Sequence, residues 1–230
     1  MSEKENNYHV LKEWTVSQGV SLFGAASIAP VRGKTVRFSP ALVSTFDTGI
    51  VLAVRLSDAV LEDIDDRPTE LYLHHYRQAN FFLDRIAFGL AQHIEQRGYR
   101  ALSIPASQII DWEHQKGHLS HKHLAVEAGL GWIGRNNLLV NPLHGARIRL
   151  VTILTTFPLQ HDGAREDSCG ECRKCLPLCP AGAIKERQEE FDHRSCFEQL
   201  CIFRKRDHIA QHICGICVKA CSGKKESASP

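Results

Sequence analysis

The chain has 230 residues, of which 43% are hydrophobic and 23% charged, so it has enough apolar material to bury a core. Its formal net charge is only +2, so the overall charge gives no reason to expect binding to nucleic acid or to an anionic membrane. No apolar run reaches membrane-spanning length. Because the first ten residues (MSEKENNYHV) lack the apolar core of a signal peptide, we expect a cytoplasmic protein.

In chain order, the first predicted element is a helix over residues 8–18, preceded by a frayed, polar start over residues 1–7. A strand is predicted over residues 20–28. Residues 30–47 are expected to be irregular because glycine and proline interrupt them. Residues 49–56 form a short, bounded, β-branched run, which indicates a buried strand.

The longest predicted element is a helix over residues 68–97. Apolar residues recur in it at steps of three or four, which places on one face Tyr72, Tyr76, Ala79, Leu83, Ile86, Leu90 and Ile94. Pro68 suits the first turn of such a helix, and Gly98 suits the position just beyond its end. The acidic segment before it, residues 57–67, is expected to be a loop or a short helix.

Shorter elements complete the N-terminal part of the chain. We expect a helix over residues 119–127 and strands over residues 99–104, 138–141 and 146–155. Alternating helices and strands predict an α/β domain. The predicted domains are an α/β domain over residues 1–160, a cysteine-rich domain over 161–222 and a low-complexity, disordered tail over 223–230.

All nine cysteines fall between Cys169 and Cys221, and so abrupt a change in composition predicts a domain boundary. Disulfides do not persist in a reducing cytosol, so clustered cysteines indicate metal or redox chemistry. The run from Cys169 to Pro180 reads C-x2-C-x2-C-x3-C-P, the spacing of bacterial two-cluster ferredoxins, in which the fourth thiolate binds the other cluster. Zinc is the alternative, because C-x2-C pairs also build zinc ribbons.

A second, incomplete run starts at Cys214 and reads C-x2-C-x3-C, with Gln211 where its first cysteine would stand. The candidates for the missing ligand are Cys196 and Cys201. We favour Cys196, which leaves Cys201 as a buried free thiol. The predicted ligands of two [4Fe–4S] clusters are then Cys169, Cys172, Cys175 and Cys221 for the first, and Cys179, Cys196, Cys214 and Cys217 for the second. Such a pair of clusters implies electron transfer from an external donor.

A resemblance to a known family rests on motifs in the second half of the chain. These are AGLGWIGRNNLL over residues 128–139, Asn141-Pro142, Gly145, the predicted strand 149–155 and the cysteines, including the isolated Cys196. Over residues 120–221 the chain resembles epoxyqueuosine reductase, a family related to the reductive dehalogenases. The resemblance implies a nitroreductase-like α/β (α+β) domain that holds base-off cobalamin above the inner of two [4Fe–4S] clusters in a ferredoxin-like domain.

The resemblance also implies that the glycine-bearing loop approaches the corrin. Missing side chains would let the backbone come close to a flat macrocycle, and Arg135 would meet a propionamide or phosphate oxygen. The alternative is that the glycines only cap a helix and turn the chain into the next strand. The predicted cofactor-binding residues are Gly129, Leu130, Gly131, Trp132, Gly134, Arg135, Asn136 and Asn137.

The chain departs from the family pattern in two ways. The family's proton-donating aspartate falls here near residues 115–118 (QKGH), which hold no carboxylate, and the chain ends without the helical-repeat domain that helps the family bind tRNA. We therefore expect a small-molecule substrate in place of tRNA, and an electron donor of ferredoxin or flavodoxin type. His118 and His121 are the predicted proton donors, because histidine can act as a general acid near neutral pH.

Two alternatives to such a reductase remain open at the level of sequence. The chain could transfer electrons to a corrinoid, or to a corrinoid-binding partner, without acting on a substrate of its own. Its N-terminal domain could instead hold a flavin, as nitroreductase-like folds commonly do.

Overall fold

The computed structural model describes residues 1–207 and 209–223, so nearly all of the predicted disordered tail lies outside the described residues. The chain forms two compact units that alternate along the sequence. The first unit comprises Met1–Val54, Ala79–Leu130 and Arg149–Arg165, and the second comprises Arg55–Gln78, Gly131–Ile148 and the described residues from Glu166 onward. The bounds of these two units differ from the predicted domain boundary at residue 160, because two segments that lie wholly before that residue in the sequence pack with the cysteine-rich part.

The first unit is built on a four-stranded sheet in the order β1-β2-β6-β3. Its strands are β1 (Leu22–Ser27), β2 (Thr48–Arg55), β3 (Ala101–Ile104) and β6 (Ile148–Thr155). Strand β1 pairs antiparallel with β2, and β3 pairs antiparallel with β6. All four strands overlap strands predicted from the sequence, so these predictions are confirmed. The antiparallel pairs make this a mixed α/β unit.

The longer helices are α1 (Glu3–Ser17), α5 (Glu70–Glu95), α6 (His121–Glu127) and α7 (His193–Arg206). Shorter ones are α2 (Ala29–Arg32), α3 (Pro40–Val43), α4 (Asp58–Glu62), α8 (Ile216–Ala220) and the 3-10 turn Gln188–Glu190. A two-stranded sheet pairs β4 (Trp132–Ile133) with β5 (Leu139–Val140). Within residues 1–207 and 209–223, no helix combines the length and hydropathy needed to cross a membrane.

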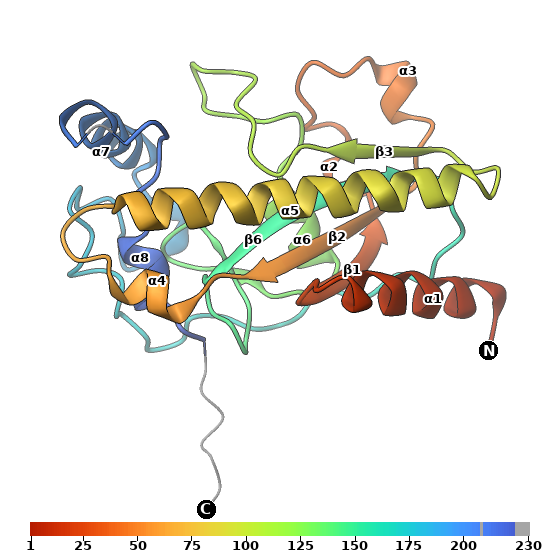
Figure 1. Cartoon of the computed structure of the whole chain (residues 1–230), viewed down its shortest axis with the longest axis horizontal. Helices are drawn as coiled ribbons and strands as arrows, with labels where there is room; N and C mark the ends of the chain where they lie inside the picture. Colours follow the sequence, from red (N-terminus) through yellow and green to blue (C-terminus); the bar gives the residue numbers. More distant parts are fainter. Residues whose placement is uncertain (208, 224–230) are drawn as a thin grey trace, which may run out of the picture. The chain divides into compact units, whose positions relative to one another are not determined.

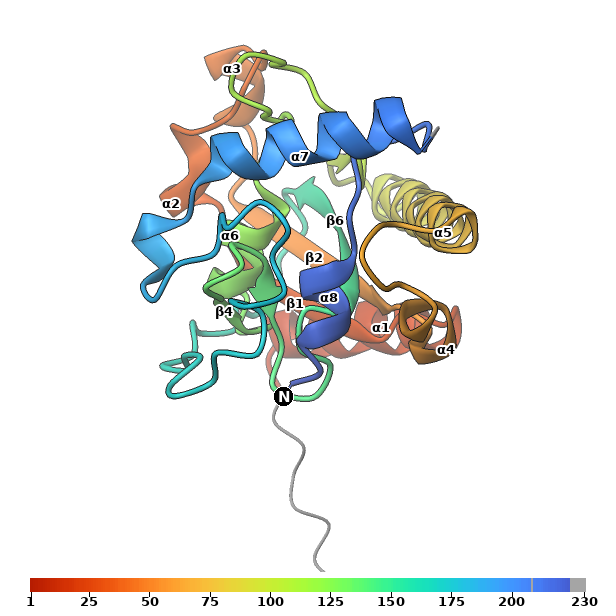
Figure 2. The same ribbon diagram turned by 90° about the vertical axis from the view of Figure 1, so that its left-hand side faces the viewer.

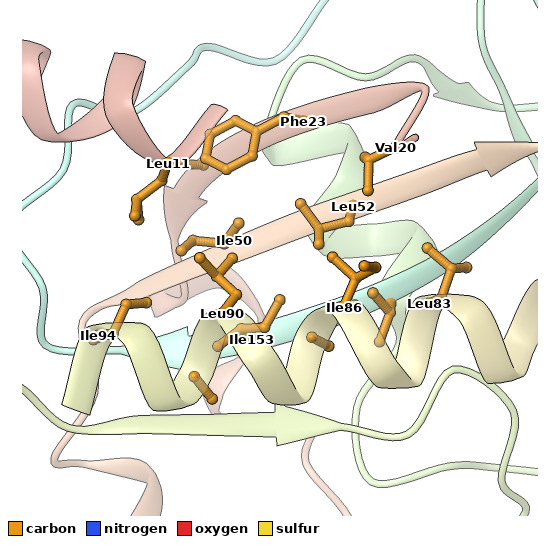
Figure 3. Packing of buried hydrophobic residues seen from close by; sticks show 14 of the residues in the cluster. Leu11, Val20, Phe23, Ile50, Leu52, Leu83, Ile86, Leu90, Ile94 and Ile153 are labelled. Carbon is orange, nitrogen blue, oxygen red and sulfur yellow. The ribbon is translucent and has the colours of Figure 1, made fainter. Parts of the chain in front are cut away.

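One face of the four-stranded sheet is covered by α1 and by the part of α5 that belongs to the first unit (Figure 1). Leu11 of α1 and Leu90 of α5 meet Ile50 of β2 in a cluster whose members are buried (Figure 3). The apolar stripe predicted on the long helix is therefore confirmed. Gly98 follows the helix with a φ of +83°, as its predicted place beyond the C-terminus requires.

Helix α6 packs against strand β1. Glycines in two strands make room for it, because a Cβ on Gly24 would lie 2.6 Å from the carbonyl oxygen of Ala128 and one on Gly49 would overlap Leu124. The sheet is thus sandwiched, with α6 on the face opposite α1 and α5. This close packing fixes the helix that carries His121.

In the second unit, α4 lies beside α8 (Figure 1). Figure 2 shows α7 and α8, the two helices of the cysteine-rich segment. Neither helix was predicted from the sequence. The predicted loop or short helix over residues 57–67 contains α4.

Two predictions about the N-terminal region were wrong. Helix α1 begins at Glu3 because Ser2 and Glu5 form a capping box, in which each side chain accepts a hydrogen bond from the other residue's backbone nitrogen. The segment 30–47, expected to be irregular, holds two single-turn helices. Each has a proline near its first position, where the missing N–H costs no helical hydrogen bond.

Candidate functional site

The thiols of the first predicted ligand set are electrostatic neighbours in the second unit. Burial, followed by the nearby thiols of Cys221, Cys169 and Cys172, raises the pKa of Cys175 to about 11. Burial also raises the pKa of Cys221, with a contribution from Cys169 and Cys172. Cys172 is exposed and the other three are partly buried. The structure therefore brings Cys221, the last cysteine of the second run, back to the first three cysteines.

The second predicted set is grouped in the same way. Burial and then Cys179 raise the pKa of Cys196 to about 11. Burial raises the pKa of Cys214 to about 11 as well, with Cys196 and Cys179 contributing. The pKa of Cys217 is raised well above its usual value by burial, and its neighbours include both Cys214 and Cys175. Through Cys217 and Cys175 the two groups adjoin.

The chemistry of these donors fits iron–sulfur clusters. Desolvation and mutual repulsion disfavour a group of neighbouring thiolates, and bound cations offset both effects. Among the described residues, no three His, Cys, Asp or Glu side chains are grouped as ligands of a single metal ion. A [4Fe–4S] cube takes four cysteine thiolates, one for each iron.

Arg135 donates hydrogen bonds to the loop that carries the first three cysteines. Its Nε donates to the carbonyl oxygen of Glu186 at 2.5 Å, its Nη1 to that of Cys172 at 2.8 Å and its Nη2 to that of Gly170 at 2.9 Å. The sequence contains no local signal for this contact, because the partners lie 35 to 51 positions further along the chain. The three hydrogen bonds hold the backbone of the loop beside the positively charged guanidinium of Arg135.

Trp132 points its indole nitrogen at a predicted cluster ligand. The ring is 6% exposed and packs with Val140 and Ala146, with Cys169 and Cys221 against this small cluster. Its Nε1 lies 3.5 Å from the Sγ of Cys169. An indole nitrogen can only donate, so the sulfur is the acceptor.

The glycines on either side of β4, Gly131 and Gly134, are needed for packing within the protein. A Cβ on Gly131 would overlap the carbonyl of Val140, and one on Gly134 would lie 2.6 Å from Val140 Cγ2 and 3.5 Å from the Sγ of Cys169. Among the remaining predicted cofactor-binding residues, Gly129 and Asn137 have positive φ, and Leu130 and Asn136 are buried.

Asn136 bears on whether a cofactor fits beside this segment. Its buried side-chain nitrogen Nδ2 makes no hydrogen bond to any part of the protein that the structure describes. A buried donor without a partner costs free energy unless a ligand or water accepts from it. This amide is therefore suited to an acceptor on a bound cofactor.

His121 is held by two internal hydrogen bonds in the first unit. Its Nε2 lies 2.9 Å from the carbonyl oxygen of Pro105, and its Nδ1 lies 2.8 Å from the Oγ1 of Thr152. Because a carbonyl only accepts, Nε2 carries the proton and Nδ1 accepts from the hydroxyl. Burial lowers the pKa of His121 to about 4, so the ring is neutral near pH 7. To donate its proton it must break the bond to Pro105.

His118 lies on the segment before α6 and has a different environment. Its Nδ1 is 3.0 Å from the carbonyl oxygen of Val36, and its ring stacks on Phe38 at a centroid distance of 4.4 Å. The bond to a carbonyl places the proton of the neutral ring on Nδ1 and leaves Nε2 as an acceptor. The role of either histidine as a proton donor stays a prediction.

Three consecutive residues, Gly145, Ala146 and Arg147, hold the chain around Cys221. Gly145 has a φ of +58°, and a Cβ there would overlap the carbonyl of Cys221. The same carbonyl accepts a hydrogen bond from the nitrogen of Ala146 at 3.1 Å. Arg147 pairs with Asp58 at 2.7 Å and also donates to the carbonyl of Lys219. Gly145 was noticed in the sequence only as part of a motif, and the contact that requires it is long-range.

Comparisons with known proteins bear on this arrangement. No family model matches the sequence. An epoxyqueuosine reductase of Synechococcus sp. (strain RCC307) is 35% identical over 116 residues, which are 48% of this chain and 36% of that protein. A reductive dehalogenase, for which a mechanism of B12-dependent dehalogenation has been suggested, superposes with a TM-score of 0.73 at 21% identity over 96% of this chain and 32% of its own. Epoxyqueuosine reductase from Streptococcus thermophilus superposes with a TM-score of 0.62 at 19% identity, over 96% of this chain and 67% of its own.

The chain therefore shares the fold of these solved structures, a mixed α/β part, which is combined here with a cysteine-rich C-terminal region. Sequence similarity and fold together relate this chain to the epoxyqueuosine reductases and the reductive dehalogenases. The family resemblance drawn from the glycine loop and the cysteines is confirmed. The chain spans about a third of the length of the Synechococcus reductase, 36%.

Proposed function

We propose that this chain is a cobalamin-dependent iron–sulfur reductase, whose two [4Fe–4S] clusters deliver electrons to the corrinoid. The observation that carries the proposal is the pair of adjoining thiol groups in the second unit. The likeness in sequence to reductases and in fold to a B12-dependent dehalogenase supports it.

Each group of residues has a proposed role in binding the cofactors. The ligands of the first cluster would be Cys169, Cys172, Cys175 and Cys221, and those of the second Cys179, Cys196, Cys214 and Cys217. Each cluster would take up and release one electron at a time, supplied by a low-potential donor of ferredoxin or flavodoxin type. Bound cobalamin would supply the reductive chemistry, acting on a small electrophilic substrate. The Nδ2 donor of Asn136 would satisfy a cofactor acceptor.

A second candidate function has a specific observation in its favour. The segment 115–118, expected to hold a proton donor, has no carboxylate, and His121 is neutral with both ring nitrogens hydrogen-bonded. A protein that only reduces a corrinoid, or a corrinoid on a partner, needs no proton donor for a substrate. In this second candidate function, the chain would bind both clusters but would have no substrate of its own.

Cobalamin binding separates these functions from a flavoprotein. Protein purified without oxygen is titrated with hydroxocobalamin and then reduced with titanium(III) citrate, while absorbance spectra are recorded against cobalamin alone. We expect a saturable shift to a base-off spectrum, followed by full reduction of the corrinoid. Loss of a supplied epoxide or organohalide then selects the reductase, and its persistence selects the electron-transfer protein. An unchanged cobalamin spectrum, or flavin absorbance in the purified protein, contradicts both.

A further inference from the structure

The loop expected from the family resemblance to face a corrin is Gly129–Asn137, and its part from Gly131 onward contacts the cysteine loop of its own unit. Gly131 marks the start of a stretch that belongs to the second unit, with all nine cysteines. Three contacts tie the segment to the first ligand set: the indole nitrogen of Trp132, the guanidinium of Arg135 and the close approach at Gly134. The inference below rests on the proposed clusters.

The hydrogen bond from Trp132 acts on a ligand sulfur. When a [4Fe–4S] cluster accepts an electron, it gains one unit of negative charge, part of which resides on its sulfurs. An N–H that points at a thiolate stabilises this added charge, and hydrogen bonds to sulfur are among the factors that set cluster potentials. Trp132 as a whole is only 6% exposed, so little water competes for its N–H.

Arg135 would affect the first cluster through its hydrogen bonds to the cysteine loop and through its positive charge. Its three hydrogen bonds hold the carbonyl dipoles of Gly170 and Cys172 toward the guanidinium. Its guanidinium places a positive charge beside the loop that would wrap the first cluster. A nearby positive charge favours the reduced, more negative state of a cluster.

We propose that Trp132 and Arg135 are positioning residues that raise the reduction potential of the first cluster, the one bound by Cys169, Cys172, Cys175 and Cys221. Trp132 does so through its N–H bond to Cys169, and Arg135 does so through its charge and its hold on the loop. These hydrogen bonds reach Cys169 and the loop of the first ligand set, so we expect the effect to fall on the first cluster of the pair.

The test is a redox titration of the full chain, purified without oxygen, with the two reduced clusters followed by electron paramagnetic resonance. The substitution Trp132→Phe keeps an aromatic ring in the pocket and removes the donor. At a fixed potential we expect the ratio of reduced to oxidised first cluster to fall about tenfold, a shift of about 59 mV to more negative potential. The second cluster should keep its potential. Trp112→Phe, at an exposed tryptophan of the first unit, is the matched control and should shift neither.

A second pair of variants tests the role of Arg135. These variants still test the inference if Trp132→Phe loses its iron and its potential cannot be measured. Arg135→Gln removes the charge and should shift the first cluster to more negative potential, whereas Arg135→Lys keeps the charge and should restore most of the shift. Wild-type potentials in cluster-loaded Trp132→Phe and Arg135→Gln overturn the inference while leaving the proposed function intact. Absence of both cluster signals from the wild-type chain contradicts the proposed function itself, so the two failures are distinguishable.

Discussion

Substituting Cys196 with alanine should lower the iron content of the chain from about eight to about four atoms per molecule, because the proposed second [4Fe–4S] cluster would lose one of its four thiolates. Alanine is the appropriate replacement, since it offers no oxygen that could take the place of sulfur. Cys196 is an electrostatic neighbour of Cys179 and Cys214, and its pKa is raised by burial and by Cys179. Iron and acid-labile sulfide, measured on protein purified without oxygen, give the answer directly.

Cys201→Ala is the matched control for this prediction. Cys201 lies on the same helix, α7, and is partly buried like Cys196, yet it belongs to neither group of neighbouring thiols. Its replacement should leave about eight irons per molecule. If Cys201→Ala loses the iron and Cys196→Ala keeps it, the two cysteines have exchanged roles and the ligand assignment is wrong. Far-ultraviolet circular dichroism checks that both variants fold.

Gly145→Ala should be strongly destabilising. The new Cβ would overlap the carbonyl of Cys221, and the φ of +58° is a conformation that residues with a side chain rarely adopt. A left-handed backbone costs an L-residue roughly 1–2 kcal/mol, and overpacking adds typically about 1–3 kcal/mol. For a chain of this size, a total of about 3 kcal/mol lowers the apparent Tm by about 6–12 °C.

Gly182→Ala separates the clash from the backbone strain. Gly182 has the same φ of +58°, but a Cβ there would meet nothing within 4 Å. We therefore expect a loss of only about 1 kcal/mol, or about 2–4 °C in apparent Tm. Thermal unfolding of cluster-loaded protein, followed by circular dichroism, compares the two variants. Equal midpoints would show that Gly145 does not pack against Cys221 as described.

The parts of the fold that follow a local pattern could be predicted from the sequence. The long helix could be predicted because its apolar residues repeat every three or four positions. The assignment of cluster ligands rests on the spacing of the cysteines and stays a prediction. The start of α1 was missed although its signal is local, since the Ser2 and Glu5 pair has the spacing of a capping box.

The site contacts could not be predicted, because they join residues far apart in the chain. Arg135 was predicted to meet a propionamide or phosphate oxygen of the corrin, and nothing near it in the sequence indicates that its partners include carbonyls of the cysteine loop. His121 was chosen for its residue type and its position before the loop. Its bonds to Pro105 and Thr152 depend on how α6 settles on the sheet, which the glycines at two strand positions allow.

The iron and sulfide contents of the wild-type chain, prepared without oxygen, decide whether it binds two [4Fe–4S] clusters. Two cubes held by the paired thiol groups predict about eight irons and about eight acid-labile sulfides per molecule, with no zinc. About four irons would leave one thiol group empty and break the proposed path for electrons. Zinc in place of iron would contradict the account altogether.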